Sequence, residues 1–280
     1  MAPVVAIVAV VVLVVVALLA YAGVGYAYSQ GRLSSAKDAY NGVVDHVNKY
    51  TDAMNSLTDK LTKTNPSTAS SAELQQTRTA VAQFVTSSQD AQAQIGPDDS
   101  SLAKAGGDLQ QNQWLTAINK SEMDKATTRI GHLRKALGDA KIVTADYVQL
   151  GTFYESFYDM LIDFDAIGAQ SGASGLGAAV DKIKTDVGKA ISQDKAPGLP
   201  TDMDAFLKDV QTTANDFTTL LNALASGDQA GAEAANAAVQ KDGTKLDSYD
   251  FNKITSAIDA FYKPMLDDYN AEVDKANSTR

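Results

Sequence analysis

Three carboxylates spaced along one predicted helix are the residues of this sequence most suited to chemistry. Glu155, Asp159 and Asp163 stand at i, i+4 and i+8, so a helix places them along one face. Clustered acids can bind a cation or hold a proton at an unusual pH. Asp267 and Asp268 stand at the equivalent place in a later helix. Glu155, Asp159 and Asp163 are therefore the candidates for a metal site, with a solvated acidic stripe as the alternative.

The familiar catalytic and cofactor motifs are absent from the sequence. The chain has no cysteine, and its two histidines, His46 and His132, lie outside any Glu-x-x-His or His-Glu-x-x-His motif, which argues against a di-iron bundle and a zincin. We expect His46 to be a partly buried packing residue and His132, among basic neighbours, to be a surface residue. The Gly-rich stretch 172–177 lacks the lysine of a phosphate-binding loop. The sequence predicts no catalytic residue, no cofactor and no enzymatic activity.

Aromatic side chains form the richest cluster in the sequence. Their helical spacing predicts that most of them belong to the core, and an aromatic-lined pocket for a small ligand is the alternative. The residues concerned are Tyr147, Tyr154, Phe157, Tyr158, Phe164, Tyr262 and Tyr269.

The elements that would position these side chains begin with an uncharged segment. The first charged residue is Arg32, and residues 4–19 are almost entirely Val, Ala, Ile and Leu. A helix rises about 1.5 Å per residue, so residues 4–28 are long enough to cross a hydrocarbon core of about 30 Å. Residues 1–31 are therefore predicted to be a single-pass transmembrane anchor that contacts the membrane through residues 4–28.

Charges near this anchor give conflicting evidence on topology. Arg32 and Lys37 follow the apolar stretch and no Lys or Arg precedes it, which by the positive-inside rule would place the body in the cytoplasm. Ala20-Tyr21-Ala22, however, fits the small-x-small pattern of a signal-peptidase site. Since the apolar run is longer than an ordinary signal sequence, we expect an uncleaved signal anchor with an extracytoplasmic body. The net charge of −10 makes nucleic acid an unsuitable partner.

The segment after the anchor has the clearest periodicity. Apolar residues of 33–61 alternate in steps of three and four, which is a heptad pattern, and Asp38, Asp45, Asp52 and Asp59 repeat on the opposite face. We expect this heptad helix to continue from the membrane helix and to mediate self-association or binding of a protein partner. Its heptad positions are Leu33, Ala36, Tyr40, Val43, Val47, Tyr50, Met54, Leu57 and Leu61.

Further amphipathic segments predict an all-α protein, an antiparallel helical bundle. Gly96-Pro97-Asp98-Asp99 is expected to break one helix and Pro264 to kink the last. The Gly-rich stretch 168–177 is expected to be a flexible joint between two units, 32–170 and 171–280, which a faint internal likeness suggests are stacked helical repeats. The helices are expected near 72–93, 101–118, from 121, around 143–164, 176–191, 202–224, 229–239 and 251–276.

Three functions fit these features. The first is a membrane-anchored, non-enzymatic helical bundle of the cell envelope that binds a partner protein, an envelope component or a small ligand. The second is a structural subunit of a surface filament or coat, assembled through its N-terminal helix as pilin-like subunits are. The third is a metal-binding helical bundle. The anchor and the coiled segment after it resemble anchored bundles of the LemA type, but no further motif is shared and no family is assigned.

Overall fold

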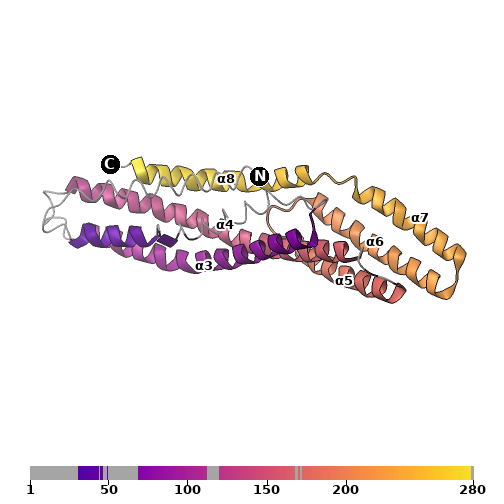
Figure 1. Cartoon of the computed structure of the whole chain (residues 1–280). Coiled ribbons are helices and arrows are strands. Elements are labelled where there is room, and N and C mark those ends of the chain that lie inside the picture. Colours follow the sequence, from indigo (N-terminus) through magenta and orange to yellow (C-terminus); the bar gives the residue numbers. More distant parts are fainter. Residues whose placement is uncertain are drawn as a thin grey trace. The chain divides into compact units, whose positions relative to one another are not determined.

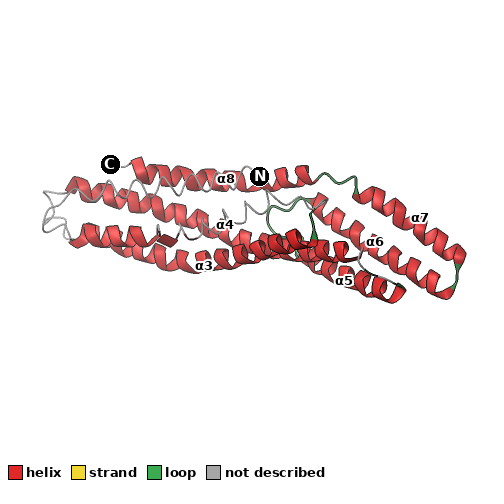
Figure 2. Ribbon diagram, viewed as in Figure 1, coloured by secondary structure: helices red, strands yellow, loops and turns green. Residues whose placement is uncertain are grey.

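The computed structural model describes residues 31–43, 45, 46, 49, 69–111, 120–167, 170 and 172–278, which are almost entirely helical (Figure 1). Figure 2 shows helices joined by short connections, with no strand among these residues. The prediction of an all-α helical bundle is therefore confirmed for the described part of the chain. The predicted membrane span, residues 4–28, lies outside the described residues. Among the helices that are described, none has the length and apolar character needed to cross a membrane.

The sequence places capping groups at several helix starts. Before α3, the Ser70 hydroxyl accepts from the Glu73 amide at 3.4 Å and the Glu73 carboxylate accepts from the Ser70 amide at 2.8 Å, which is a capping box. Asp228 accepts from the Gly231 amide at 3.0 Å where α7 begins. The labelled helices are α3 (Ser71–Gln110), α4 (Lys120–Ile167), α5 (Ala173–Ser192), α6 (Thr201–Ser226), α7 (Gln229–Leu246) and α8 (Phe251–Ser278).

The expected break at Gly96–Asp99 is wrong, because α3 continues through it to Gln110 with Pro97 inside the helix. A proline in a helix interior costs about 3 kcal/mol. Burial on either side offsets that cost, since Ile95 is 8% exposed, Leu102 0% and Leu109 1%. Tertiary packing therefore overrides a local sequence that favours a turn.

The helices predicted from residue 121 onward agree with the structure to within a few residues, with two exceptions. Two of them join into one helix, and α7 is longer than expected. The helix expected from Ser121 and the one around 143–164 are a single continuous helix, α4, of 48 residues. α7 extends to Leu246 rather than ending near Val239, and α8 continues through Pro264.

The chain divides into two compact units, and both are built from separated segments. Unit 1 comprises the described residues of Met1–Thr58, Thr86–Val148 and Tyr262–Arg280, and unit 2 those of Asp59–Val85 and Gln149–Phe261. This division differs from the expected boundary at residue 171. The reason is that α3, α4 and the C-terminal helical region each contribute residues to both units, so neither unit is a continuous stretch of sequence.

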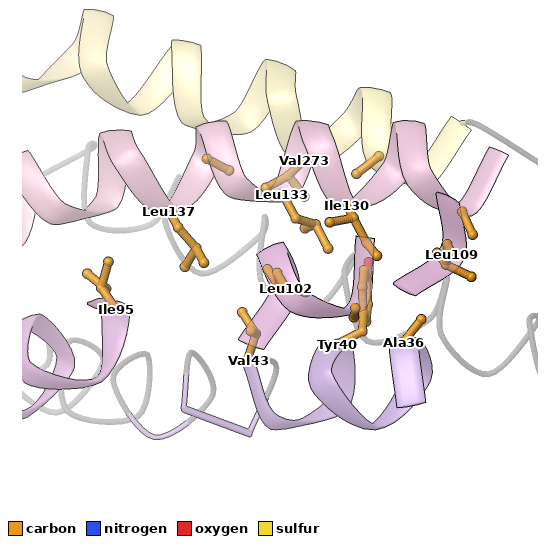
Figure 3. Packing of buried hydrophobic residues seen from close by; sticks show 14 of the residues in the cluster. Ala36, Tyr40, Val43, Ile95, Leu102, Leu109, Ile130, Leu133, Leu137 and Val273 are labelled. Carbon is orange, nitrogen blue, oxygen red and sulfur yellow. The ribbon is translucent and has the colours of Figure 1, made fainter. Parts of the chain in front are cut away.

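The described residues of unit 1 include a hydrophobic core to which the N-terminal helical segment 31–43 contributes (Figure 3). Ala36, Tyr40 and Val43 are 5–7% exposed, so these heptad positions pack into the core of unit 1. Asp38 and Asp45 are exposed, as expected of an outer face. The other residues of this cluster that Figure 3 labels come from α3, α4 and α8: Ile95, Leu102, Leu109, Ile130, Leu133, Leu137 and Val273.

In unit 2, α6 packs against both α5 and α7. α5 and α6 bury Val180, Ile183, Met203 and Leu207 at 0–2% exposure. Two residues join α6 to α7: Gly227 adopts the left-handed conformation, with φ 73°, and Asp228 caps the next helix. A glycine relieves the steric cost of that conformation, which permits so short a connection.

Helices α3 and α4 approach each other closely within unit 2 at Gly151. A Cβ added there would lie 2.5 Å from Val85 Cγ2 and 3.4 Å from Phe84 Cδ1. Since carbon atoms pack favourably at about 3.5–4.0 Å, only glycine fits this position without displacing its neighbours.

Candidate functional site

The three predicted acids lie on α4 beside its buried apolar face, where Phe153 and Met160 are 0% exposed. Helical spacing brings the acids to one side of α4 as expected, but the structure does not gather all three around one open position. Asp159 and Asp163 are each engaged by a basic side chain from a different neighbouring helix.

Asp159 forms a bidentate ion pair with Arg78 of α3. Arg78 Nε lies 3.0 Å from Asp159 Oδ1 and Arg78 Nη2 lies 3.3 Å from Oδ2. This hydrogen bond raises the pKa of Arg78, and the charge of Glu155 adds to the effect. The guanidinium group thus provides the positive charge that a metal ion would have supplied to these two acids.

Asp163 contacts α5. Its side chain is 4% exposed and its Oδ1 accepts a hydrogen bond from Lys182 Nζ. Asp186 lies on the same helix as Lys182, has a side chain 7% exposed, and accepts from Lys189 Nζ at 2.6 Å. The Asp163 and Asp186 carboxyl groups also lie within hydrogen-bonding reach of each other. The resulting group, Lys182–Asp163–Asp186–Lys189, is called here the α4–α5 charge network.

Burial and the neighbouring charges act differently on the two carboxyl groups. Burial, together with the hydrogen bond to Asp186, raises the pKa of Asp163 despite the ion pair with Lys182. At Asp186 burial works in the same direction, but hydrogen bonds to Asp163 and Lys189 outweigh it and lower the pKa. Asp163 is therefore the carboxyl group of this pair that binds a proton more readily.

Sequence reasoning missed Lys182, Asp186 and Lys189. The i, i+4 and i+3 spacings among them are visible, but such spacings on a single helix ordinarily indicate exposed pairs. Only the packing of α5 on α4 makes Asp186 a buried partner of Asp163.

Both histidines are engaged by carboxylates of other helices in unit 1. His46 Nδ1 lies 3.0 Å from Asp98 Oδ2, and the His46 side chain is 35% exposed, in agreement with a partly buried position. His132 Nδ1 lies 2.7 Å from Glu272 Oε2 of α8, and its side chain is only 22% exposed. The expectation that His132 is a surface residue is therefore wrong, because α8 covers it.

The aromatic residues of unit 2 pack against one another. Ring centroids lie 6.2 Å apart for Phe157 and Phe206, 5.1 Å for Phe206 and Phe251, and 6.0 Å for Phe153 and Phe157. Burial raises the pKa of Tyr158 to about 12, so this phenol stays protonated at physiological pH. These rings pack directly against one another, which agrees with the prediction that most of the aromatic residues belong to the core.

Across the described ranges, no group of three or more His, Asp or Glu side chains is arranged to hold a metal ion. The α4–α5 charge network is therefore the strongest candidate site among these residues, and its chemistry is that of ion pairing and proton binding. No known protein family, characterised protein or solved structure matches this chain.

Proposed function

We propose that this protein is a non-enzymatic helical bundle, tethered to a membrane by residues 4–28, which acts by holding its acidic body at the membrane and binding a protein partner there. The observation that carries the proposal is the abrupt change at Arg32. No charged residue precedes it, and all 58 charged residues of the chain, 24 basic and 34 acidic, lie from that position onward. Such a partition is typical of a membrane anchor followed by a water-exposed domain.

The use of the polar side chains supports a non-enzymatic role. General acid–base catalysis requires a side chain positioned to exchange a proton with a substrate. His46 and His132 instead pair with Asp98 and Glu272. Asp159 pairs with Arg78, which also argues against the metal-binding alternative.

The heptad helix bears on the filament alternative. A filament assembled through this helix would need its apolar positions to face another subunit. Ala36, Tyr40 and Val43 instead contribute to the core of unit 1, while residues 50–61 lie outside the described residues. This packing favours a tethered bundle, with its partner bound elsewhere, over assembly through residues 33–43.

The tether is tested by placing charge inside the apolar run of the full chain. Each Arg at the centre of a membrane helix opposes insertion by about 2.5–3.5 kcal/mol. We therefore expect Val12→Arg/Val14→Arg to move the protein from alkaline-washed membranes to the soluble fraction, with helical circular dichroism retained. The matched variant Val12→Leu/Val14→Leu should stay in the membrane. Retention of the arginine variant would show that residues 4–28 are not the tether.

Topology and binding need separate measurements. Protease added to intact cells should cleave an extracytoplasmic body, whereas complete protection would place it in the cytoplasm. A photo-crosslinking residue at the exposed positions Ile142 or Leu224, which are 57% and 60% exposed, should give one defined heavier species in membranes. Absence of any crosslink at several exposed positions would argue against a protein partner.

A further inference from the structure

Two buried carboxyl groups of unit 2 face each other between α4 and α5. Asp163 is 3% exposed and Asp186 5%, and their carboxyl groups lie within hydrogen-bonding distance of each other. One oxygen of each is already used, since Asp163 Oδ1 accepts from Lys182 and Asp186 Oδ1 accepts from Lys189. The second oxygen of each carboxyl group receives no hydrogen bond from these two lysines.

The second carboxylate oxygen of Asp163 lacks a hydrogen-bond donor. Oδ2 is fully buried and no donor reaches it. Two ionised carboxylates cannot satisfy each other, because both are acceptors only, and an unpaired buried acceptor is costly. A proton on one carboxyl group supplies an O–H donor and at the same time removes one of two like charges from a buried position.

We propose that Asp163 and Asp186 share one proton and form a proton-binding site between α4 and α5. The groups that face this site from α5, besides Asp186, are Lys182 and Lys189, and Asp159 lies one turn away on α4, where it is paired with Arg78 of α3. The side chains of Lys182 and Lys189 are 66% and 56% exposed. Solvent screens these two positive charges, so they do not replace the proton.

The direction of the pH dependence follows from the two carboxyl groups. Burial raises the pKa of Asp163 above its usual 3.8, so the stability from its proton is fully present below that value and is lost as pH rises through the raised pKa. Hydrogen bonds to Asp163 and Lys189 lower the pKa of Asp186 against the effect of burial, so its contribution is present above 3.8 and is lost as pH falls further. The pair therefore stabilises unit 2 most in mild acid.

The same arrangement recurs at the next helix interfaces of unit 2. The Asp204 carboxyl group of α6 lies within hydrogen-bonding reach of that of Asp194, which follows α5, and the Asp242 carboxyl group of α7 lies within reach of that of Asp216 of α6. In each pair one buried oxygen, Asp204 Oδ1 or Asp242 Oδ2, has no partner. The proposal concerns Asp163 and Asp186, because both of their side chains are buried, but the recurrence shows that carboxyl–carboxyl contacts are a regular feature of this unit.

Infrared spectroscopy of the full chain in detergent tests the proposal directly, because a protonated carboxyl group has a C=O stretching band that a carboxylate lacks. At pH 5, about one unit above the ordinary aspartate pKa, the wild type should retain a protonated-carboxyl band. In Asp163→Asn the band should weaken by the intensity that one protonated carboxyl group contributes. The control Asp165→Asn, an exposed acid of the same helix, should leave the band unchanged.

A second variant and a stability measurement keep the test decisive. Asp186→Asn should also remove the band component, because its amide donates to Asp163 and replaces the shared proton. Against wild type, Asp163→Asn should melt at an equal temperature near pH 4 and about 2–4 °C higher at pH 8, where the wild-type proton is lost. A wild type without the band at pH 5, or a band that survives in both variants, would overturn the proposal. If both variants were equally destabilised at every pH and kept the band, Asp163 and Asp186 would act only as partners of Lys182 and Lys189 in two structural ion pairs.

Discussion

Gly151 offers a sharp test of the close approach of α3 and α4. In an exposed helix interior, Gly→Ala stabilises a protein by about 1 kcal/mol, because alanine loses less backbone entropy on folding. At Gly151 the new Cβ would lie 2.5 Å from Val85 Cγ2, at least about 1 Å closer than carbon atoms pack favourably. Overpacking of this kind costs about 1–3 kcal/mol. We therefore expect Gly151→Ala to lower the free energy of unfolding by up to about 2 kcal/mol.

The same helix supplies the matched control. Gly138 is also inside α4, and a Cβ added there meets nothing within 4 Å. Gly138→Ala should therefore raise the free energy of unfolding by up to about 1 kcal/mol. The same chemical change at two positions of one helix is thus expected to have opposite signs.

Urea unfolding of the full chain, followed by circular dichroism, measures both effects, and a double-mutant cycle identifies the cause. Val85→Ala removes Cγ2 and should make Gly151→Ala less destabilising in that background, with a coupling of about 1 kcal/mol. A stabilising Gly151→Ala, or a cost that Val85→Ala leaves unchanged, would refute the inference that these two side-chain positions collide.

Three further predictions concern the core, a helix-interior proline and an ion pair. Phe153 is 0% exposed, so Phe153→Ala should cost about 3–5 kcal/mol in denaturant unfolding; a loss below 1 kcal/mol would contradict its burial. Pro97→Ala should stabilise the protein by up to about 3 kcal/mol, because it restores a helix hydrogen bond inside α3; a destabilised variant would show that the native helix requires the proline. Hydrogen bonds to Lys275 and His132 lower the pKa of Glu272 to about 2, so its stabilisation is present above the usual 4.5 and is lost as pH falls toward 2. Glu272→Gln should therefore melt below wild type at pH 7 and converge with it near pH 2, and a constant difference across that range would contradict the shift.

Helix positions could be predicted from the sequence because apolar spacing follows the 3.6-residue period of the buried face. In the predicted helix near 72–93, Leu74, Val81 and Phe84 have this spacing, and they are 1–5% exposed. The continuity of α3 through Pro97 could not be predicted in the same way. Gly-Pro-Asp-Asp is a strong local turn signal, and the burial that outweighs it involves side chains from distant segments.

The candidate site was predicted in part. Asp163 was identified from its spacing, but the sequence cannot distinguish a solvated stripe from a buried pair, because that depends on which helix packs alongside. The partner Asp186 becomes visible only when α5 is placed against α4. Phe164 and Tyr269 illustrate the same limit: their helical spacing predicts core positions, yet both are only partly buried.

The composition of the unit 1 core has a consequence for synthesis on the ribosome. Ala36, Tyr40 and Val43 share this core with Val273 and Ala276, which lie at the opposite end of the described sequence. Contacts between such distant segments form slowly, because a long loop must close first. The unit 1 core therefore stays incomplete until α8 has been translated, while the α6–α7 hairpin can form as soon as its own residues emerge. Unit 1, although it contains the earliest described residues, is therefore the last to complete its core, and its apolar side chains are the ones most open to misassembly during translation.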